Sequence, residues 1–239
     1  MIKKDEELLF TKSASWRMFD EISVRYDLLN RILSLGLDIR WRRKLCGFIR
    51  AKPHQDLLDL ATGTGDVLLA LTGNPHIHRA IGIDMADRML TIGKTKIRKR
   101  GLDPTLTLQH GDIHHLPFAN ESFDVATIAF GIRNVAEPQR VLAEMFRVLK
   151  PKGQALILEF SLPENPCLRA GHWVYLNAVV PLIGFSLSGH SSAYRYLART
   201  IESFPYGDRF RKILKQMGFV NIQSKALMGG AATVYWADK

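Results

Sequence analysis

The sequence has few cysteines and no pattern that would join them. Of its 239 residues, only Cys46 and Cys167 are cysteines, and they lie far apart. This excludes a disulfide framework and a zinc site of the CxxC type, and we expect no metal. The first ten residues, MIKKDEELLF, contain acids and too short an apolar run for a signal peptide. We therefore expect a protein of the reducing cytoplasm.

One long segment lacks charge altogether. Between Ala170 and Tyr194 there is no Asp, Glu, Lys or Arg. A helix that spans a bilayer needs ~20 predominantly apolar residues. This segment is interrupted by Asn177, Pro181 and Gly184, so we interpret it as a buried or interfacial insert rather than a membrane span.

Acidic residues are outnumbered by basic ones, 23 against 33, which gives a net charge of +10. This balance favours an anionic partner such as a membrane surface, an acidic metabolite or a nucleic acid, although solvated lysines alone produce the same count. The basic run KTKIRKR, from Lys94 to Arg100, has no interleaved aromatic residues for base stacking. The [Asp/Asn]-Pro-Pro-[Tyr/Phe] loop of amine-methylating enzymes is also absent. We therefore do not expect a nucleic acid partner.

The periodicity predicts an α/β fold. From Asp56 to Phe160, short apolar runs alternate with helical stretches, as in a mostly parallel sheet with helices on both faces. Residues 14 to about 50 show helical spacing, with a break at Gly36 and a second helix expected from Trp41 to Arg50. The last 25 residues or so indicate a helix end and two further strands, paired antiparallel at an edge of the sheet.

The stretch LLDLATGTGD, from Leu57 to Asp66, combines an apolar run with a glycine-containing turn. Such a turn lets a ligand approach the backbone at the carboxyl end of a parallel strand. A dinucleotide fingerprint G-x-G-x-x-G would have its third glycine at Leu68, so the sequence disfavours an NAD(P) site. A plain strand-to-helix loop is the alternative.

Three acids stand where successive strands are expected to end: Asp59, Asp84 and Asp112. Asp84 follows Gly65 by 19 residues and can accept both hydroxyls of a ribose. Asp112 can accept a hydrogen bond from an adenine amino group, although Asp also serves as a helix cap. Together with the glycine turn, these acids indicate an adenosyl ligand without a pyrophosphate.

This set of motifs resembles the class I S-adenosylmethionine-dependent methyltransferases. The resemblance implies a Rossmann-like, seven-stranded sheet whose last strand is antiparallel. It also implies a metal-free site that binds S-adenosylmethionine and releases S-adenosylhomocysteine. The implied cofactor residues are Asp59, Gly63, Thr64 and Gly65 for the methionine part, Asp84 and Met85 for the ribose, and Asp112 and Ile113 for the adenine. Ala61 stands where that motif commonly has its first glycine.

Three peripheral motifs are more specific. They are YDLLNRILSLGLDIRW (Tyr26 to Trp41), FGIRNV (Phe130 to Val135) and YRYLARTIESFP (Tyr194 to Pro205). They resemble the ubiquinone/menaquinone biosynthesis C-methyltransferase family over nearly the whole chain. One departure is Asp38, where the family usually has a histidine. We expect a helical lid over residues 1–50 and a methyltransferase domain over residues 51–239, with an apolar helical insert at about 165–200.

The resemblance implies transfer of a methyl group to a ring carbon of a prenylated quinol. Arg133 and Asn134 are the implied catalytic residues, since they follow the fourth strand at the edge of the expected crevice. Tyr26 and Asn30, on one helix, and Tyr194 are candidate substrate contacts. The alternative for each residue is a structural role. Arg133 and Asn134 would then cap a helix or form an ion pair, and the tyrosines would pack in the core.

Several questions stay open at this point. The acceptor is demethylmenaquinol by preference, with a ubiquinol precursor as the other option. Rival functions are a phospholipid amine N-methyltransferase, an RNA methyltransferase and a binding protein that has lost catalysis. We expect peripheral contact with the inner face of the membrane. The oligomeric state is also open, with a homo-oligomer or a biosynthetic complex as the options.

Overall fold

The computed structural model describes residues 12, 15–71, 73–102, 104–182 and 191–239. For Arg25, Leu29, Leu33 and residues 191–195 only the backbone is described. The strands are β1 (Gln55–Leu60), β2 (Ile77–Asp84), β3 (Leu106–His110), β4 (Phe123–Ala129), β5 (Leu149–Phe160), β6 (Val220–Leu227) and β7 (Ala232–Asp238). The α-helices are α2 (Ser15–Glu21), α3 (Ser23–Leu33), α4 (Leu37–Cys46), α5 (Asp66–Ala70), α6 (Asp87–Lys99), α7 (Pro138–Val148), α8 (Pro166–Val174), α10 (Ser191–Ser203) and α11 (Asp208–Gln216).

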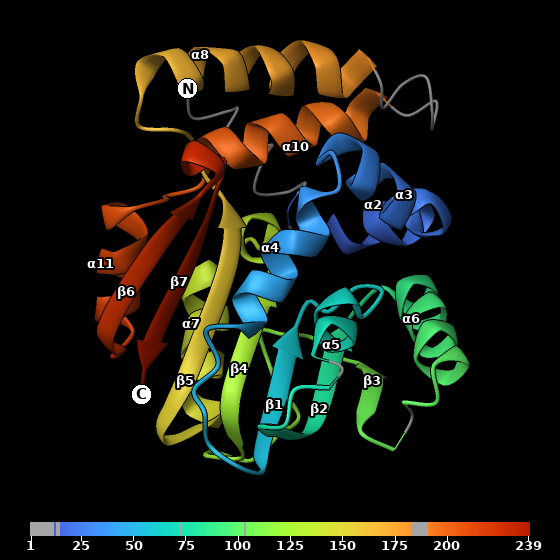
Figure 1. Cartoon of the computed structure of the whole chain (residues 1–239), viewed down its shortest axis with the longest axis vertical. Coiled ribbons are helices and arrows are strands. Elements are labelled where there is room, and N and C mark those ends of the chain that lie inside the picture. Colours follow the sequence, from blue (N-terminus) through green and yellow to red (C-terminus); the bar gives the residue numbers. More distant parts are fainter. Residues whose placement is uncertain (1–11, 13–14, 72, 103, 183–190) are drawn as a thin grey trace.

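The seven strands form one sheet in the order β3-β2-β1-β4-β5-β7-β6 (Figure 1). Neighbours from β3 to β5 pair in parallel, whereas β7 runs antiparallel to both β5 and β6. The expected seven-stranded, mostly parallel sheet with an antiparallel last strand is therefore confirmed. The strand order reverses between β1 and β4, so the carboxyl ends of these two strands border the crevice typical of such sheets.

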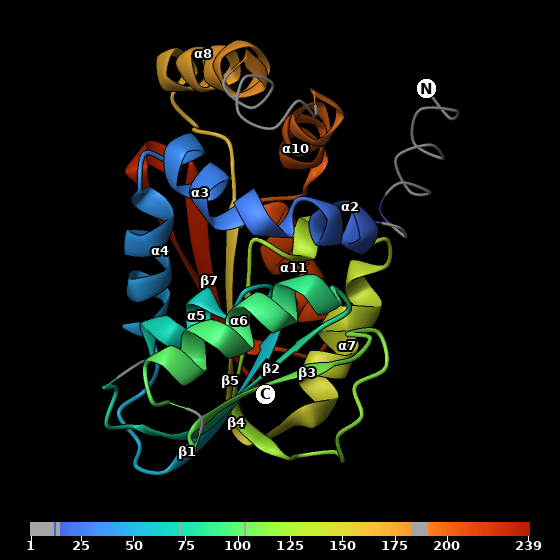
Figure 2. The ribbon, with the colours of Figure 1, turned by 90° about the vertical axis from the view of Figure 1, so that its right-hand side faces the viewer.

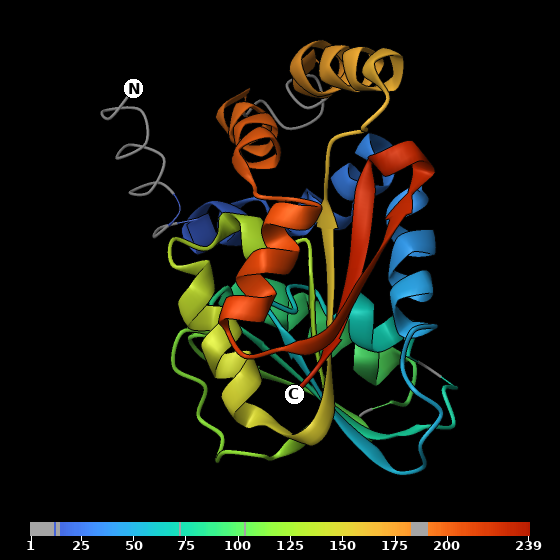
Figure 3. The ribbon, with the colours of Figure 1, turned by 90° about the vertical axis from the view of Figure 1, so that its left-hand side faces the viewer.

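Helices cover both faces of the sheet, as Figures 2 and 3 show from opposite sides. On one face, α7 and α11 pack against the sheet through Met145 and Phe210, among others. On the other face, α4, α5 and α6 bury Leu45, Leu68 and Leu90 against the same strands. Because both faces are covered, the central strands are apolar runs rather than alternating patterns. Leu57, Leu58 and Leu60 of β1 are fully buried, for example.

The N-terminal helices differ in detail from the expected pair. The break at Gly36 is confirmed, since its φ of +74° is in the left-handed region that favours glycine. A further break at Ile22 separates α2 from α3. The last of these helices begins at Leu37 rather than Trp41, and it ends at Cys46 rather than Arg50. Gly36 is the N-cap of α4, so the helix begins at the next residue. The hydrophobic periodicity alone did not indicate this start.

The apolar insert lies above the carboxyl edge of the sheet as two helical segments (Figure 1). The first is α8, which Asn165 caps by accepting hydrogen bonds from the backbone N–H groups of Cys167 and Leu168. It continues through a π-helical segment, η2 (Tyr175–Val179), and the second segment is α10. Residues 183–190 of the expected insert lie outside the described residues. Among the helices that the structure describes, none combines the length and apolarity needed to cross a membrane.

Candidate active site

A pocket opens at the carboxyl edge of the sheet, next to the point where the strand order reverses. We call it the edge pocket. Helix α2 and the loops after β1 to β4 form its walls. The residues that line it at the end of β2 and in these loops are Ala61, Gly63, Asp84, Met85, Ile113, His114, Phe130, Gly131, Asn134, Val135 and Ala136. It brings together four residues predicted to bind the cofactor (Gly63, Asp84, Met85 and Ile113).

The glycine turn after β1 places its backbone against this pocket. Gly63 and Gly65 have φ angles of +57° and +77°, which a residue with a side chain rarely adopts. The N–H of Gly63 donates to Oδ2 of Asp84 at 2.8 Å, so the turn is tied to the end of β2. Ala61 has a φ of +50°. Its backbone conformation explains why glycine is common at this position of the motif.

Asp84 holds its carboxylate at the lip of the edge pocket. Oδ2 accepts from Gly63, and Oδ1 accepts from the backbone N–H of Ala86 at 2.9 Å. A carboxylate has about four acceptor positions, so these bonds orient the group and leave capacity for a ligand hydroxyl. Burial raises the pKa of Asp84, although the backbone N–H groups oppose that effect.

Asp59 supports the turn from below and does not line the pocket. It is 1% exposed and accepts hydrogen bonds from the hydroxyls of Thr62 at 2.7 Å and Thr127 at 2.6 Å. Burial raises the pKa of Asp59 to about 7, against the effect of these two hydroxyls. The carboxyl group therefore joins β1, β4 and the turn in one buried cluster.

Three other predicted cofactor residues also stand outside the lining of the edge pocket. The hydroxyl of Thr64 donates to Oδ1 of Asp27 at 2.7 Å, so it contacts α3. Gly65 precedes α5 and shapes the turn. Asp112 is partly exposed and accepts from the backbone N–H of His114 at 2.9 Å. Their ligand contacts stay predictions.

A second pocket adjoins the first, and we call it the insert pocket. Tyr26 and Phe130 line both pockets and so form their common wall. The insert pocket receives Asn30 and Arg42 from the N-terminal helices and Arg133 from the loop after β4. Asp38, Ser34 and His172 also line it. Its remaining lining is apolar or aromatic and includes Trp41, Phe160, Tyr175, Leu176, Val180, Leu197 and Ile201. The side chain of Tyr194, a predicted substrate contact, lies outside the described residues.

Arg133 and Asn134 divide between the two pockets: Arg133 lines the insert pocket and Asn134 the edge pocket. Nη1 of Arg133 donates to Oε1 of Glu159 at 2.7 Å and to the carbonyl oxygen of Phe130 at 2.5 Å. Glu159 is fully buried, and the Arg133 side chain is 5% exposed. The ion pair therefore fixes the guanidinium at the end of β4, as one of the sequence alternatives anticipated.

Two buried polar atoms of this pair have no hydrogen-bond partner among the described residues. They are Nε of Arg133 and Oδ1 of Asn134. Orphaned buried polar atoms are rare in native proteins and call for an explanation, such as a missing ligand or water. Within the part of the chain that the structure describes, this pair of residues therefore has one unsatisfied buried donor and one unsatisfied buried acceptor at the end of β4.

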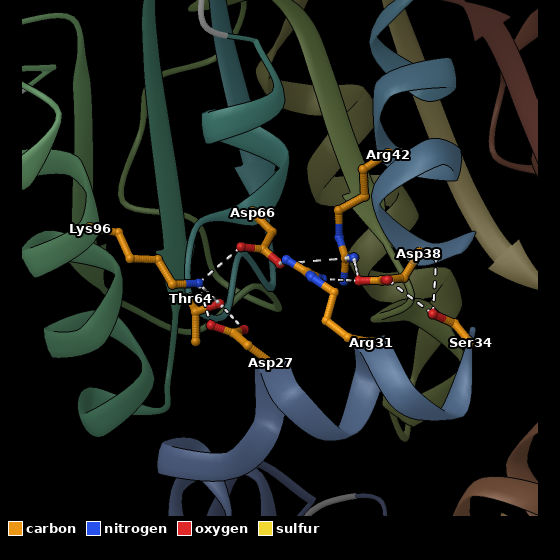
Figure 4. A network of polar contacts seen from close by, with 8 residues as sticks. All are labelled: Asp27, Arg31, Ser34, Asp38, Arg42, Thr64, Asp66 and Lys96. Carbon is orange, nitrogen blue, oxygen red and sulfur yellow. Dashed lines mark hydrogen bonds and ion pairs between the residues drawn. The ribbon is translucent and has the colours of Figure 1, made fainter. Parts of the chain in front are cut away.

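A polar network fastens the N-terminal helices to the glycine turn (Figure 4). It consists of Asp27, Arg31, Ser34, Asp38, Arg42, Thr64, Asp66 and Lys96. Lys96 of α6 donates to Thr64 and to Oδ1 of Asp66, both at 2.9 Å, and pairs with Asp27. Burial alone would raise the pKa of Asp66, but Arg42, Lys96 and Arg31 together lower it.

Asp38 is the second acidic centre of this network. It is 3% exposed and accepts from Nη1 of Arg42 at 2.7 Å and from the hydroxyl of Ser34 at 2.9 Å. It also pairs with Arg31, whose Nη2 donates to Asp66 at 3.1 Å. The two aspartates thus share two arginines, and they connect α3 and α4 with the start of α5.

The sequence analysis missed Arg42, Asp66 and Lys96 as parts of this arrangement. Asp38 and Arg42 are four residues apart on α4, a spacing that places them on one helix face. That signal was present in the sequence. The contacts with Asp66 and Lys96 join distant segments, and no local pattern indicates them. Within the described part of the chain, no three His, Cys, Asp or Glu residues form a group that could hold a metal.

The sheet order, the glycine turn and the acid at the end of β2 are those of the Rossmann-like class I methyltransferase fold. Comparison with known families is more specific: the model of the ubiE/COQ5 methyltransferase family matches residues 10–239. The chain belongs to this family. The family resemblance noted in the sequence is thereby confirmed.

Relatives with assigned names support the same family. The chain is 38% identical to a demethylmenaquinone methyltransferase of Bacteroides fragilis, over 93% of this chain and 91% of the relative. It is 39% identical to a protein of that name from Thermus thermophilus, over 93% and 100%. A ubiquinone/menaquinone biosynthesis C-methyltransferase UbiE of Geotalea daltonii is 42% identical, over 93% and 94%.

Solved structures share the fold at low sequence identity. A SAM-dependent methyltransferase from Thermotoga maritima, a possible histamine N-methyltransferase, superposes with a TM-score of 0.66 at 19% identity, over 94% of this chain and 99% of that one. The [4+2]-cyclase SpnF gives 0.69 at 16% identity, over 95% and 96%. Because a cyclase shares this architecture, the fold alone does not determine the reaction.

The buried carboxyl of Asp59 should make stability depend on pH. Its pKa of about 7 in the folded protein exceeds the value of about 3.9 for an unfolded chain, so the folded state binds this proton more tightly. The free energy of unfolding should therefore fall as the pH rises from about 4 to about 7, by at most about 4 kcal/mol for this group. Asp59→Asn should flatten this dependence in urea titrations.

The exposed Asp208 provides a matched control, because Asp208→Asn should leave the pH dependence as it is in the wild type. If the free energy of unfolding of Asp59→Asn depends on pH as steeply as that of the wild type, the pKa of Asp59 is not raised in the folded protein.

Proposed function

We propose that this chain transfers the methyl group of S-adenosylmethionine to a ring carbon of a prenylated quinol, with demethylmenaquinol as the favoured acceptor. The observation that carries the proposal is the pair of adjoining pockets. One is bordered by the glycine turn and Asp84, and the other is a largely apolar pocket that contains the buried Arg133. The printed names of the relatives, which refer to demethylmenaquinone and to ubiquinone/menaquinone biosynthesis, support the same acceptor class.

The edge pocket suits an adenosyl ligand. Asp84 is positioned to accept the ribose hydroxyls, Met85 and Ile113 supply apolar contacts, and Oδ1 of Asn134 is an unused buried acceptor. Asp59 and the glycine turn hold this arrangement in place. When bound, S-adenosylmethionine supplies an electrophilic methyl group and leaves as S-adenosylhomocysteine.

The insert pocket suits the acceptor ring and the start of its prenyl tail. A ring carbon becomes nucleophilic when the neighbouring hydroxyl loses its proton, so the substrate is the reduced quinol. The guanidinium of Arg133 stabilises the resulting phenolate, and the common wall of Tyr26 and Phe130 sets the ring against the edge pocket. Arg133 stays protonated, so the base that removes the proton is a different group, such as a water. The accepting carbon gains the methyl group and then loses its own proton, which restores the aromatic ring.

The apolar insert suits contact with a membrane surface, where a prenylated acceptor resides. Leu176 and Val180 face the core, but Trp173 is 57% exposed and Leu182 is 69% exposed. An amphipathic segment of this kind can lie in the plane of a lipid interface, and a net charge of +10 favours anionic lipid. We therefore place the protein in the cytoplasm, peripherally bound to the inner face of the membrane.

Asp84→Ala should weaken S-adenosylmethionine binding by ~1.5–3 kcal/mol, the value of a hydrogen bond to a charged group. Because Asp84 also holds the N–H of Gly63, Asp84→Asn is needed as a companion. The amide keeps one acceptor for the turn but cannot accept at both ligand hydroxyls. Calorimetry on both folded variants measures the effect. Wild-type affinity in the two variants would exclude Asp84 from the ribose site.

Arg133→Ala should lower kcat by about a hundredfold or more, since it removes a preorganised cation from the developing anion. The affinity for S-adenosylmethionine should change little, because Arg133 lines the other pocket. The assay measures transfer of labelled methyl groups to a demethylated menaquinol. The wild type should require a reductant, because the oxidised ring has no hydroxyl to deprotonate.

A control is needed because Arg133→Ala leaves Glu159 buried without its cation. That loss alone should lower the free energy of unfolding by about 3–5 kcal/mol. The double variant Arg133→Ala/Glu159→Gln should regain stability without regaining turnover. Equal transfer to the oxidised quinone would contradict the mechanism. Labelling of phosphatidylethanolamine or RNA, with no transfer to any quinol, would instead support one of the rival functions.

The double variant Trp173→Ser/Leu182→Ser should reduce binding to anionic vesicles by about tenfold or more, because burying each side chain contributes ~1.5–3 kcal/mol. Vesicle pelleting measures this, and the fluorescence of Trp173 should shift to the blue when the wild type binds. Val220→Ser is a matched control: Val220 is 52% exposed at the opposite end of the sheet. If all three proteins pellet alike, the insert does not bind lipid.

A further inference from the structure

Arg42 is a buried cation of the insert pocket that the proposed mechanism leaves without a role. It lies on α4, its side chain is 8% exposed, and it lines the same pocket as Arg133. A buried guanidinium is costly unless it is paired, so its position calls for an explanation. The ion pair with Asp38, which lines the same pocket, explains why Arg42 is tolerated there, but that pair uses only one nitrogen of the guanidinium.

The two arginines occupy equivalent positions on a pair of aromatic rings. Phe130 and Phe160 lie with ring centroids 4.6 Å apart. The guanidinium carbon of Arg42 is 5.3 Å from the centroid of Phe130, and that of Arg133 is 4.9 Å from the centroid of Phe160. Each cation is thus held over one ring of the pair. The pocket therefore contains two separate guanidinium groups next to one aromatic wall, together with the carboxylate of Asp38.

Arg42 is oriented firmly and keeps unused donors. Its Nη1 donates to Asp38 at 2.7 Å and lies 3.9 Å from Oδ2 of Asp66. Among the described residues, no hydrogen bond is made by its Nε or Nη2. A guanidinium has five N–H donors in a rigid fork, so anchoring at one nitrogen leaves the others available to a ligand. Asp38, at the position where the resemblance implies a histidine, supplies this anchor.

Tyr26 shows that both cations act on the junction of the pockets. Burial raises the pKa of its phenol, whereas Arg42 and, more weakly, Arg133 act to lower it. Tyr26 belongs to the wall that the pockets share. A phenol-like ring in the insert pocket beside Tyr26 would therefore experience both guanidinium groups.

We propose that Arg42 binds the second ring oxygen of the acceptor, while Arg133 binds the oxygen next to the carbon that receives the methyl group. The inference rests on the proposed function. A quinol has two oxygens on opposite edges of one ring, so two separate donors are needed to hold both. Arg42 thus makes the site select a two-oxygen ring over a simple phenol, and it fixes which ring carbon faces the edge pocket.

The test compares two acceptors in four proteins. One acceptor is a prenylated naphthalene diol with a free carbon beside one hydroxyl, and the other is the same molecule without the opposite hydroxyl. The measured quantity is the ratio of their kcat/KM values, in which the general effects of a substitution on folding or cofactor binding cancel. The proteins are the wild type, Arg42→Met, Arg42→Gln and Arg31→Met.

Arg31→Met is the matched control, because Arg31 also pairs with Asp38 and Asp66 but does not line either pocket. The wild type should prefer the diol, and both Arg42 variants should lower that preference by about tenfold or more. Arg31→Met should keep the wild-type ratio even if its overall activity falls.

Equal loss toward both acceptors in the Arg42 variants would show that Arg42 is only structural, and a lowered ratio in Arg31→Met would also overturn the proposal. A wild type that uses both acceptors equally well overturns it without any variant, should the Arg42 variants fail to fold. A wild type that binds S-adenosylmethionine but methylates neither acceptor would instead refute the proposed function.

Discussion

The attachment of α3 and α4 to the glycine turn is the constraint on which both pockets depend. These helices supply Tyr26, Asn30 and Arg42 to the pockets. They are attached mainly by ion pairs, in which Asp38 and Asp66 are the anions and Arg31, Arg42 and Lys96 are the cations. A buried ionic network specifies one geometry, because misplaced charges would be left unpaired at high cost. The network that holds the hydroxyl of Thr64 through Asp27 and Lys96 therefore also includes Asp38 and Arg42, which line the insert pocket.

The two pockets differ in the charged side chains that line them. The edge pocket has Asp84 and Lys12, whereas the insert pocket has Arg42 and Arg133 against its aromatic wall, with Asp38 beside Arg42. The two guanidinium groups of the insert pocket outnumber its one carboxylate, and such a lining suits an anionic ring. Tyr26 and Phe130 line both pockets, so a methyl donor in one pocket and an acceptor ring in the other would lie on either side of the same two side chains.

The fold and the position of the edge pocket could be predicted from the sequence, because both follow from local patterns. Buried strands, the turn around Gly63 and the acid ending β2 each have a recognisable signature at short range. The partners of Asp66 and Lys96 could not be found in this way, since side chains from α3, α5 and α6 meet only in three dimensions. Arg42 was overlooked for a different reason: in an amphipathic helix, an arginine is usually a solvated residue, and only the packing of Phe130 and Asp38 shows it to be buried.

The burial of the junction has a consequence for the reaction. Methyl transfer from a sulfonium to a phenolate converts two opposite charges into neutral groups, so the transition state is less charged than the reactants. Water stabilises the separated charges and would raise the barrier, whereas a lining of fixed dipoles and aromatic rings does not. Phe130 and Phe160 line the wall with aromatic rings, and Arg133 is paired with Glu159. In the proposed mechanism, the guanidinium would stabilise the ring anion enough for it to form, while its counter-ion Glu159 would keep it from holding that anion too tightly to react.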